Sequence, residues 1–305
     1  MLFKSKGPAG KTLVRSKSLL LSAQQGYSRP PPGKSWFQTT TTVWRTDELI
    51  RRSVRDWRRL TNETGHTGER AQTMRKDHES VYTGTSSVFA APLVEWILLR
   101  YGVPGGRILD AFAGGPPRAV VSSIMGYEYT GFELRQAQID ENEAVLKELK
   151  LGNVRYICGD ARTLDADLPQ FDCALTCPPY YDLEVYSDLA ADLSHMGSYE
   201  EFDAAMAQCA FAHVRHMKPG AFVCIVVGPF RDKKTGELID FPAHTVENFR
   251  RVGFIYWQQI VLSKNFASAA VRSTNAWKGH KLVPAHEFLL VFRTPENGGS
   301  KKRKT

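Results

Sequence analysis

From residue 87 to residue 293 the sequence alternates between segments with the apolar spacing of a helix and short apolar runs typical of a strand. Because two parallel strands need a crossover connection, this alternation predicts an α/β fold with a doubly wound, mostly parallel sheet of seven strands. The last two strands have no helix between them and are predicted to pair antiparallel at one edge. The predicted strands are 107–112, 127–133, 154–158, 171–176, 221–228, 254–262 and 286–292, and the predicted helices are 87–102, 118–126, 134–152, 198–220 and 241–253.

The composition fits a globular protein with reduced cysteines. The chain has 305 residues, 42% of them hydrophobic, and no apolar run reaches the ~20 residues that a membrane-spanning helix needs. Its five cysteines are odd in number and form no Cys-x-x-Cys pair, which favours neither a disulfide framework nor a zinc site. We therefore expect a reducing, intracellular setting, with no membrane partner and no metal.

Both ends of the chain are basic. Residues 1–46 contain no acid, and we expect a disordered basic arm over 1–43. An organelle transit peptide is the alternative, but the Pro-rich stretch RPPPGKS counts against it. The tail 294–305 is also predicted to be disordered, and its charge run suits a solvated surface better than a nuclear address. The net charge of +8 fits a polyanionic partner, although a basic surface without a partner is nearly as common.

Residues 44–84 are predicted to form an extension before the main domain, which spans 85–293. Within the extension, 44–60 has apolar residues near helical spacing with arginines around them. This pattern predicts an amphipathic helix whose basic face either contacts phosphates or is simply solvated. The rest of the extension is polar and contains glycine, which predicts a loop.

Acidic residues lie at the tips of the first three predicted strands: Asp110, Glu133 and Asp160. The carboxyl ends of parallel strands share one edge of the sheet, which is where such folds bind ligands. After the first strand, Gly114 and Gly115 allow a tight turn that can approach a ligand closely. Three acids disfavour a phosphate and suit an uncharged or cationic nucleoside, although Asp110 and Asp160 would each also serve as helix caps.

The fourth predicted strand ends in TCPPYYD, residues 176–182. Pro178 and Pro179 cannot donate to a sheet, so the strand must stop there and leave a rigid aromatic corner at the same edge. A Pro-Pro-aromatic corner that follows a D-x-F-x-G-G turn resembles the S-adenosylmethionine-dependent amino-methyltransferases of DNA. The resemblance covers roughly residues 85–293, and it rests on LDAFAGG standing before TCPPYYD. The stretch after the prolines also resembles phage and bacterial members.

The resemblance implies methylation of adenine N6 or cytosine N4 in a base flipped out of DNA, with S-adenosylmethionine as cofactor. The side chain of Cys177 and the backbone carbonyl of Pro178 would accept hydrogen bonds from the amino group. Pro179 would stiffen the turn, and Tyr180 would stack on the base. Asp110 would face the methionine part of the cofactor, Glu133 its ribose and Asp160 its adenine amino group, in a site lined by Phe89, Phe112, Gly114 and Gly115.

Two positions depart from the family's pattern. Cys177 stands where the family usually carries Asp, Asn or Ser, and sulfur is a weak acceptor. The sequence GGPPR stands where a third small residue is common. Either the neighbours of Cys177 suffice, or activity is impaired, or the substrate differs. A nucleophilic role for Cys177, as in methylation of cytosine carbon-5, is disfavoured because those enzymes place the cysteine after the proline.

No dedicated recognition domain is visible, so DNA contacts are expected in the long connection between the last two strands. Its basic and aromatic residues suit phosphate contact and base stacking, although a plain exposed loop is the alternative. The candidates are Lys264, Arg272, Trp277, Lys278 and Lys281. The basic N-terminal region is a further candidate, and the polar stretch 185–198 is placed to close over the site.

We therefore expect a site-specific DNA methyltransferase that acts on adenine N6 or cytosine N4 in the cytoplasm of a bacterium or a phage host. Its oligomeric state stays open, as does a role in restriction–modification, phage protection or regulation. Two alternatives also stay open. One is an N-methyltransferase of RNA bases with the same fold, and the other is a catalytically impaired protein that only binds nucleic acid.

Overall fold

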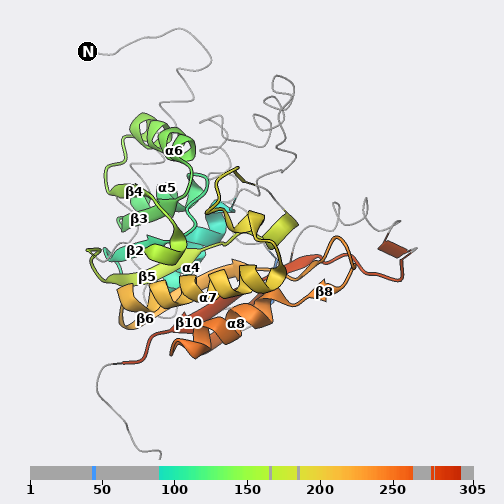
Figure 1. Cartoon of the computed structure of the whole chain (residues 1–305). Coiled ribbons are helices and arrows are strands. Elements are labelled where there is room, and N and C mark those ends of the chain that lie inside the picture. The colour runs from blue at the N-terminus through green and yellow to red at the C-terminus, as the bar shows by residue number, and fades with distance from the viewer. Residues whose placement is uncertain are drawn as a thin grey trace, which may run out of the picture.

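The computed structural model describes residues 43–45, 89–164, 167–183, 186–263, 276–277 and 279–296. Within these ranges the chain forms an eight-stranded sheet in the order β1-β9-β10-β6-β5-β2-β3-β4, with helices on both sides (Figure 1). The strands of this sheet are β1 Val43–Arg45, β2 Arg107–Asp110, β3 Glu128–Glu133, β4 Val154–Cys158, β5 Phe171–Thr176, β6 Met217–Val227, β9 Ile255–Ser263 and β10 His286–Arg293. The seven predicted strands are therefore confirmed, and β1 adds a short eighth strand.

The helices divide between the two faces of the sheet (Figure 1). One face carries α4 Ala91–Tyr101, α5 Pro117–Ile124 and α6 Gln136–Leu149, and the other carries α7 Tyr199–His216 and α8 Phe241–Arg251. Side chains along a strand alternate between the two cores, so that Ile108 packs on the α4 side and Leu109 on the α7 side. Helices on both faces explain why the central strands are continuous apolar runs. The predicted doubly wound α/β fold is confirmed.

The path of the chain fixes where a ligand site can form. From β2 the chain moves outward to β3 and β4, and then returns to build β5 and β6 on the other side of β2. The order therefore reverses between β2 and β5, which pair in parallel. In open sheets of this kind the crevice at the carboxyl ends of the two strands is the ligand site.

The last strand runs against its neighbours. β10 lies between β6 and β9 and pairs antiparallel with both. The antiparallel pairing of the last two strands is therefore confirmed, with β10 one position inside the sheet. Because of its direction, the first residues of β10 lie at the edge where the parallel strands end. This order of strands, with one inserted antiparallel strand, is that of the class I Rossmann-like methyltransferase fold.

The helix predicted over 198–220 ends earlier than expected. Helix α7 stops at His216, and β6 begins at Met217 without an intervening loop. Pro219 disfavours helical backbone at the residue before it, and Gly220 has a positive φ of 74°. The chain therefore leaves the helix about one turn before residue 220. The predicted end of this helix was wrong.

The start of the predicted basic helix is also wrong. Trp44 and Arg45 lie in β1, whose backbone pairs parallel with β9, and Val43 stands opposite Val261. An edge strand such as β9 has unpaired backbone groups that can take up an added strand. β1 spans the predicted boundary at residue 43, and the rest of the predicted helix lies outside the described residues.

A small hairpin at the ligand-binding edge was not predicted. It consists of β7 Phe230–Arg231 and β8 Leu238–Ile239, which pair antiparallel. Two-residue strands carry too short an apolar pattern to be recognised in a sequence.

The ordered chain extends slightly past the predicted end of the main domain. Thr294 is buried, and its N–H donates to the carbonyl of Ala221 at 2.9 Å, so the pairing of β10 with β6 continues. The predicted arm before residue 43 and the tail from residue 297 lie outside the described residues. Within the ranges given above, none of the helices combines the length and apolarity needed to cross a bilayer.

Candidate functional site

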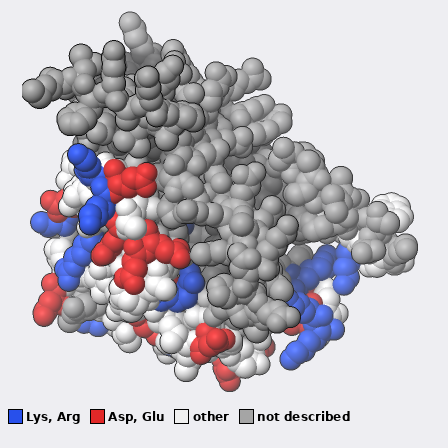
Figure 2. Space-filling model, turned by 90° about the horizontal axis from the view of Figure 1, so that it is seen from above, with Lys and Arg blue, Asp and Glu red and all other residues white. Residues whose placement is uncertain are grey.

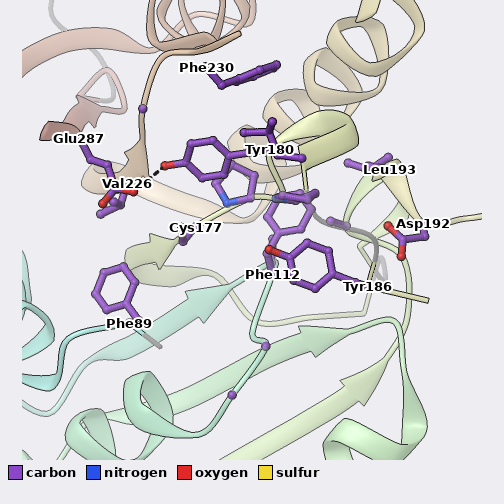
Figure 3. A pocket seen from close by; sticks show the side chains of 18 of the residues that line it. Phe89, Phe112, Cys177, Tyr180, Tyr186, Asp192, Leu193, Val226, Phe230 and Glu287 are labelled. Atoms are coloured by element: carbon purple, nitrogen blue, oxygen red, sulfur yellow. Dashed lines mark hydrogen bonds between the residues drawn. The ribbon is translucent and has the colours of Figure 1, made fainter. Parts of the chain in front are cut away.

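A pocket of about 810 Å³ lies at the carboxyl ends of the parallel strands, where the strand order reverses (Figure 3). This volume is within the range of small-molecule sites. Its wall combines the start of α4, the turns after β2 and β5, the ends of β3 and β4, and the start of β10. The predicted site residues that line it are Phe89, Phe112, Gly114, Gly115, Glu133, Asp160, Cys177, Pro178, Pro179, Tyr180 and Lys281. The predicted cofactor corner and the Pro-Pro-Tyr corner thus share one cavity.

Asp110 lies behind the wall of the pocket. It is fully buried, and its Oδ2 accepts hydrogen bonds from Arg118 Nε at 2.5 Å and from the Tyr129 hydroxyl at 2.6 Å. Its Oδ1 accepts from the Thr176 hydroxyl at 2.8 Å and from the Phe112 N–H at 3.2 Å. These donors satisfy the carboxylate, as burial of a charge requires. Asp110 therefore ties β2, β3, β5 and α5 together, and its predicted contact with the cofactor stays a prediction.

Arg118 lines the pocket and was not among the predicted site residues. Besides Asp110, its guanidinium donates to the carbonyls of Phe112 at 2.5 Å and Ala113 at 2.9 Å. The guanidinium carbon lies 4.8 Å from the centre of the Phe89 ring. Burial lowers the pKa of Arg118, but the carboxylate of Asp110 more than compensates and the pKa is raised. The arginine of the unusual GGPPR sequence is therefore the cation that neutralises Asp110. In the sequence, GGPPR stood out only as a departure from the family's pattern.

Glu133 holds the Gly-rich turn from the end of β3. Its Oε2 accepts from the Gly114 N–H at 3.0 Å, and its Oε1 accepts from the Arg135 N–H at 3.0 Å. Gly114 has a φ of 50°, and a Cβ there would meet nothing closer than the Phe112 carbonyl oxygen at 4.0 Å. The space beside this glycine is thus open to a ligand. A carboxylate next to that space suits the predicted ribose contact, which stays a prediction.

Asp160 acts as a cap, which was one of the two roles considered for it. It precedes a short 3₁₀ helix, η1 Ala161–Thr163, and accepts the Arg162 N–H at 2.8 Å. Its carboxylate also forms an ion pair with the Arg162 guanidinium at 2.6 Å. The side chain still lines the pocket, so the predicted contact with an adenine amino group stays open.

The Pro-Pro-Tyr corner projects from the end of β5 into the pocket. The ring of Tyr180 packs edge-on against Phe230 and Phe241, with ring centres 6.3 Å and 5.9 Å apart. Its hydroxyl donates to Glu287 Oε1 at 3.2 Å (Figure 3). Burial raises the pKa of Tyr180 well above its ordinary value, and Cys177 and Glu287 raise it further. The phenol therefore keeps its proton and acts as the donor in this hydrogen bond.

The bend after Tyr180 is strained. Tyr181 has a φ of 44°, a left-handed conformation that is uncommon for any residue except glycine. Its buried ring packs against Tyr199 and Phe202, with ring centres 5.9 Å and 5.6 Å apart. These contacts from α7 stabilise the bend and so fix the direction in which Tyr180 points.

The polar stretch predicted to close over the site forms one side of the pocket. Tyr186, Ser187, Asp192 and Leu193 line the cavity (Figure 3). Buried Asp192 accepts from the Ser187 hydroxyl at 2.8 Å and from the hydroxyl and N–H of Ser194 at 2.7 Å and 2.9 Å. One carboxylate therefore holds both ends of this segment in place.

The structure describes two of the residues predicted to contact DNA. Lys281 lines the pocket, and Trp277 is 78% exposed. Lys264, Arg272 and Lys278 lie outside the described residues.

A second group of basic residues near the pocket was missed. Arg231 lines the pocket, and Lys233 and Lys234 follow it in the β7–β8 hairpin. Lys281 lies against this hairpin, because a Cβ at Gly236 would collide with its Nζ. Figure 2 shows the molecule from above, with a group of Lys and Arg side chains at one edge of the view, apart from the mixed charges elsewhere in it. The signal in the sequence was RDKK shortly after the fifth predicted strand.

The cofactor corner of the pocket has acceptors that suit the nucleoside part of S-adenosylmethionine. Glu133 and Asp160 present carboxylates, and the Gly-rich turn leaves open space beside them. Acceptors of this kind suit hydroxyl and amino groups and a positively charged sulfur. Within the described ranges, no group of three or more His, Cys, Asp or Glu is arranged to hold a metal ion.

Comparison with known proteins gives likenesses of structure alone. No protein-family model matches the sequence, and no curated protein matches it. TrmN from Thermus thermophilus aligns with a TM-score of 0.48 and 16% identity, over 68% of this chain and 50% of TrmN. An S-adenosylmethionine-dependent methyltransferase from Methanosarcina mazei aligns with a TM-score of 0.47 and 15% identity, over 66% of this chain and 98% of its own. A proposed DNA modification methylase, also from Thermus thermophilus, aligns with a TM-score of 0.34 and 25% identity, over 47% of this chain and 53% of its own.

Proposed function

We propose that this protein transfers a methyl group from S-adenosylmethionine to the exocyclic amino nitrogen of a flipped base in DNA, either adenine N6 or cytosine N4. The observation that carries the proposal is the shared cavity. The Gly-rich turn with Glu133 and the corner with Tyr180 come from distant parts of the sequence, yet both line the same pocket. A cofactor and a second flat ring can therefore meet in it.

At the cofactor corner, Glu133 and Asp160 would bind the nucleoside, and Phe89 and Phe112 would enclose its methionine end. When bound, S-adenosylmethionine supplies a methyl group on a positively charged sulfur. Transfer of this methyl group would form an N–C bond to the substrate nitrogen in place of the C–S bond, whose electron pair would stay on the sulfur. Asp110 and Arg118 position the turn from behind.

At the substrate corner, the prolines would hold the backbone carbonyl of Pro178 toward the pocket because they fix φ. That carbonyl would accept one N–H of the amino group, and Tyr180 would pack against the ring of the base. A base within a duplex cannot reach such a recessed site, so it must be flipped out of the helix. Arg231, Lys281 and the lysines of the hairpin are placed to contact the phosphates beside the flipped nucleotide.

The proposal is tested by incubating the full chain with S-adenosylmethionine that carries a deuterated methyl group, together with duplex DNA, single-stranded DNA or structured RNA. The nucleic acid is digested and its nucleosides are identified by mass spectrometry. We expect labelled N6-methyladenine or N4-methylcytosine from DNA. Label in RNA alone would assign the protein to RNA bases.

A second result would favour the catalytically impaired alternative. In that case calorimetry would detect binding of S-adenosylmethionine, while no labelled nucleoside would form with any of the nucleic acids. The departure at Cys177 makes this measurement necessary, since sulfur is a weak acceptor for the amino group.

A further inference from the structure

We propose that Glu287 supplies the side-chain acceptor for the substrate amino group that the Pro-Pro-Tyr motif lacks at Cys177. This inference rests on the proposed function and identifies a residue that acts at the same site. Glu287 was not among the residues that the sequence indicated, because it lies more than a hundred residues after the motif and on the last strand of the sheet.

The direction of β10 brings Glu287 to the pocket. Since β10 runs antiparallel to β6 and β9, its first residues lie at the edge where the parallel strands end. In the register of the sheet, Glu287 pairs with Leu262, and the next residue, Phe288, pairs with Val227 at the end of β6. Glu287 thus enters the cavity from the strand neighbouring β6, beside the corner at the end of β5.

The side chain of Glu287 points to the substrate corner. Its Oε1 accepts the hydroxyl of Tyr180 at 3.2 Å, and Figure 3 shows the two side chains meeting on the same side of the pocket as Cys177. A carboxylate has about four acceptor positions, so the hydrogen bond from Tyr180 still permits Glu287 to accept an amino N–H.

Gly228 makes room for this pair. A Cβ at position 228 would lie 3.1 Å from Glu287 Cγ and 3.5 Å from the Tyr180 hydroxyl. The φ of Gly228 is not positive, so the backbone conformation alone does not require glycine there. A side chain at this position would press on Glu287, while its contact with Tyr180 would be an ordinary one.

The other carboxylates that line the pocket bind groups away from the Pro-Pro-Tyr corner. Glu133 binds the Gly-rich turn, Asp160 pairs with Arg162, and Asp192 holds the segment after the motif. Among the described residues that line the pocket, Glu287 is the carboxylate bonded to Tyr180. It therefore has both the chemistry and the position of the missing acceptor.

In the reaction, a Glu287 oxygen accepts one N–H of the amino group, which turns the lone pair of the nitrogen out of the plane of the ring. After the N–C bond has formed, the nitrogen carries a positive charge and releases this proton. The Glu287 carboxylate takes the proton and passes it to water.

The test is a binding measurement that does not depend on methyl transfer. Fluorescence anisotropy gives the dissociation constants of short single-stranded oligodeoxynucleotides for the full chain, saturated with S-adenosylhomocysteine. One pair of probes carries adenine or purine, and the other carries cytosine or 2-pyrimidinone, so the members of each pair differ only by the amino group. We expect the wild type to prefer the amino-bearing member of one pair by about tenfold to a hundredfold, the effect of one hydrogen bond to a charged acceptor.

Glu287→Leu should abolish this preference, and Glu287→Gln, which keeps the shape and one neutral acceptor, should reduce it. Tyr180→Phe is the matched control, because it removes the hydrogen bond to Glu287 but keeps both the ring and the carboxylate. The inference is overturned if Glu287→Leu retains the preference or if the wild type shows none. It is also overturned if Tyr180→Phe loses as much of the preference for the amino-bearing probe as Glu287→Leu does, since Glu287 would then act only by holding Tyr180.

The failure of this inference can be told from the failure of the proposed function. One outcome is that the wild type prefers the amino-bearing probe through Glu287 and yet forms no labelled nucleoside. This result would contradict the proposed reaction and support Glu287 as the recognition residue. If the Glu287→Leu variant methylates DNA as fast as the wild type, the result supports the reaction and contradicts the role of Glu287.

Discussion

At the scale of single residues, the sequence indicated which side chains lie near the pocket better than it indicated their hydrogen-bond and ion-pair partners. Asp110 lies at the tip of β2 as expected, but its partner Arg118 was visible only as an irregularity in a Gly-rich turn. Glu287 could not be assigned from the sequence, because its position at the site depends on the insertion of β10 between β6 and β9. Contacts between distant segments are set by the topology of the sheet, and a local pattern does not contain them.

Asp110→Asn tests whether this residue belongs to the scaffold or to the ligand site. The change leaves the buried guanidinium of Arg118 without a charged partner, so the free energy of unfolding should fall by about 3–5 kcal/mol in urea titrations. Glu128→Gln is the control, since its ion pair with Arg107 is exposed and contributes at most about 1 kcal/mol. Unchanged stability with weaker cofactor binding would instead place Asp110 in contact with the cofactor.

Glu133→Gln tests the cofactor corner. The variant loses the charged acceptor beside the Gly-rich turn, and calorimetry should show S-adenosylhomocysteine binding about tenfold more weakly. Glu128 begins the same strand that Glu133 ends, so Glu128→Gln serves again as a control and should bind normally. Equal affinities for the wild type and Glu133→Gln would show that the ligand binds away from β3.

At the scale of elements, two strands were predicted to the residue. β4 and β5 have the predicted bounds, because each is a short run rich in β-branched, aromatic or other apolar residues between turn residues. The errors lie where a backbone constraint competes with the pattern, as at the end of α7, or where pairing alone creates the strand, as in β1 and the β7–β8 hairpin.

Helix α7 carries a buried histidine that makes stability depend on pH. Burial lowers the pKa of His213 from its ordinary value of 6.5, and its Nε2 has no hydrogen-bond partner among the described residues. As the pH falls below 6.5, the unfolded chain takes up a proton that the folded chain does not, so the free energy of unfolding decreases.

His213→Phe keeps the ring contact with Phe249 and removes the titrating group. The loss of stability between about pH 7.5 and about pH 5.5, measured by urea unfolding, should therefore be smaller in this variant than in the wild type. A wild-type stability that rises on acidification would contradict the assignment.

At the scale of the whole molecule, the basic groups near the pocket support the proposal of a nucleic-acid partner. Lys281 and the lysines of the β7–β8 hairpin lie on the edge of the sheet where the pocket opens, whereas Lys147 lies in the last turn of α6. The net charge of +8 describes the whole chain and says nothing about this arrangement. The fold class was predictable from the sequence, but the convergence of these charges on the pocket required the structure.

A double variant, Lys234→Ala with Lys281→Ala, tests this surface. If each lysine contacts one phosphate, the slope of the logarithm of DNA affinity against the logarithm of salt concentration should become less steep by about 0.9 for each. Anisotropy titrations over a range of salt concentrations measure the slope. Lys147→Ala should leave it unchanged, and an equal loss per lysine removed in the two variants would show that binding follows total charge alone.

The central claim is that one pocket receives both the cofactor and the base. The most direct measurement is a crystal structure of the full chain with S-adenosylhomocysteine and an oligonucleotide that carries the modified base. We expect the cofactor product to contact Glu133 beside the Gly-rich turn, and the base to lie against Tyr180 in the same cavity. A cofactor product bound elsewhere, or one that fills the Tyr180 corner and leaves the base outside, would contradict the account.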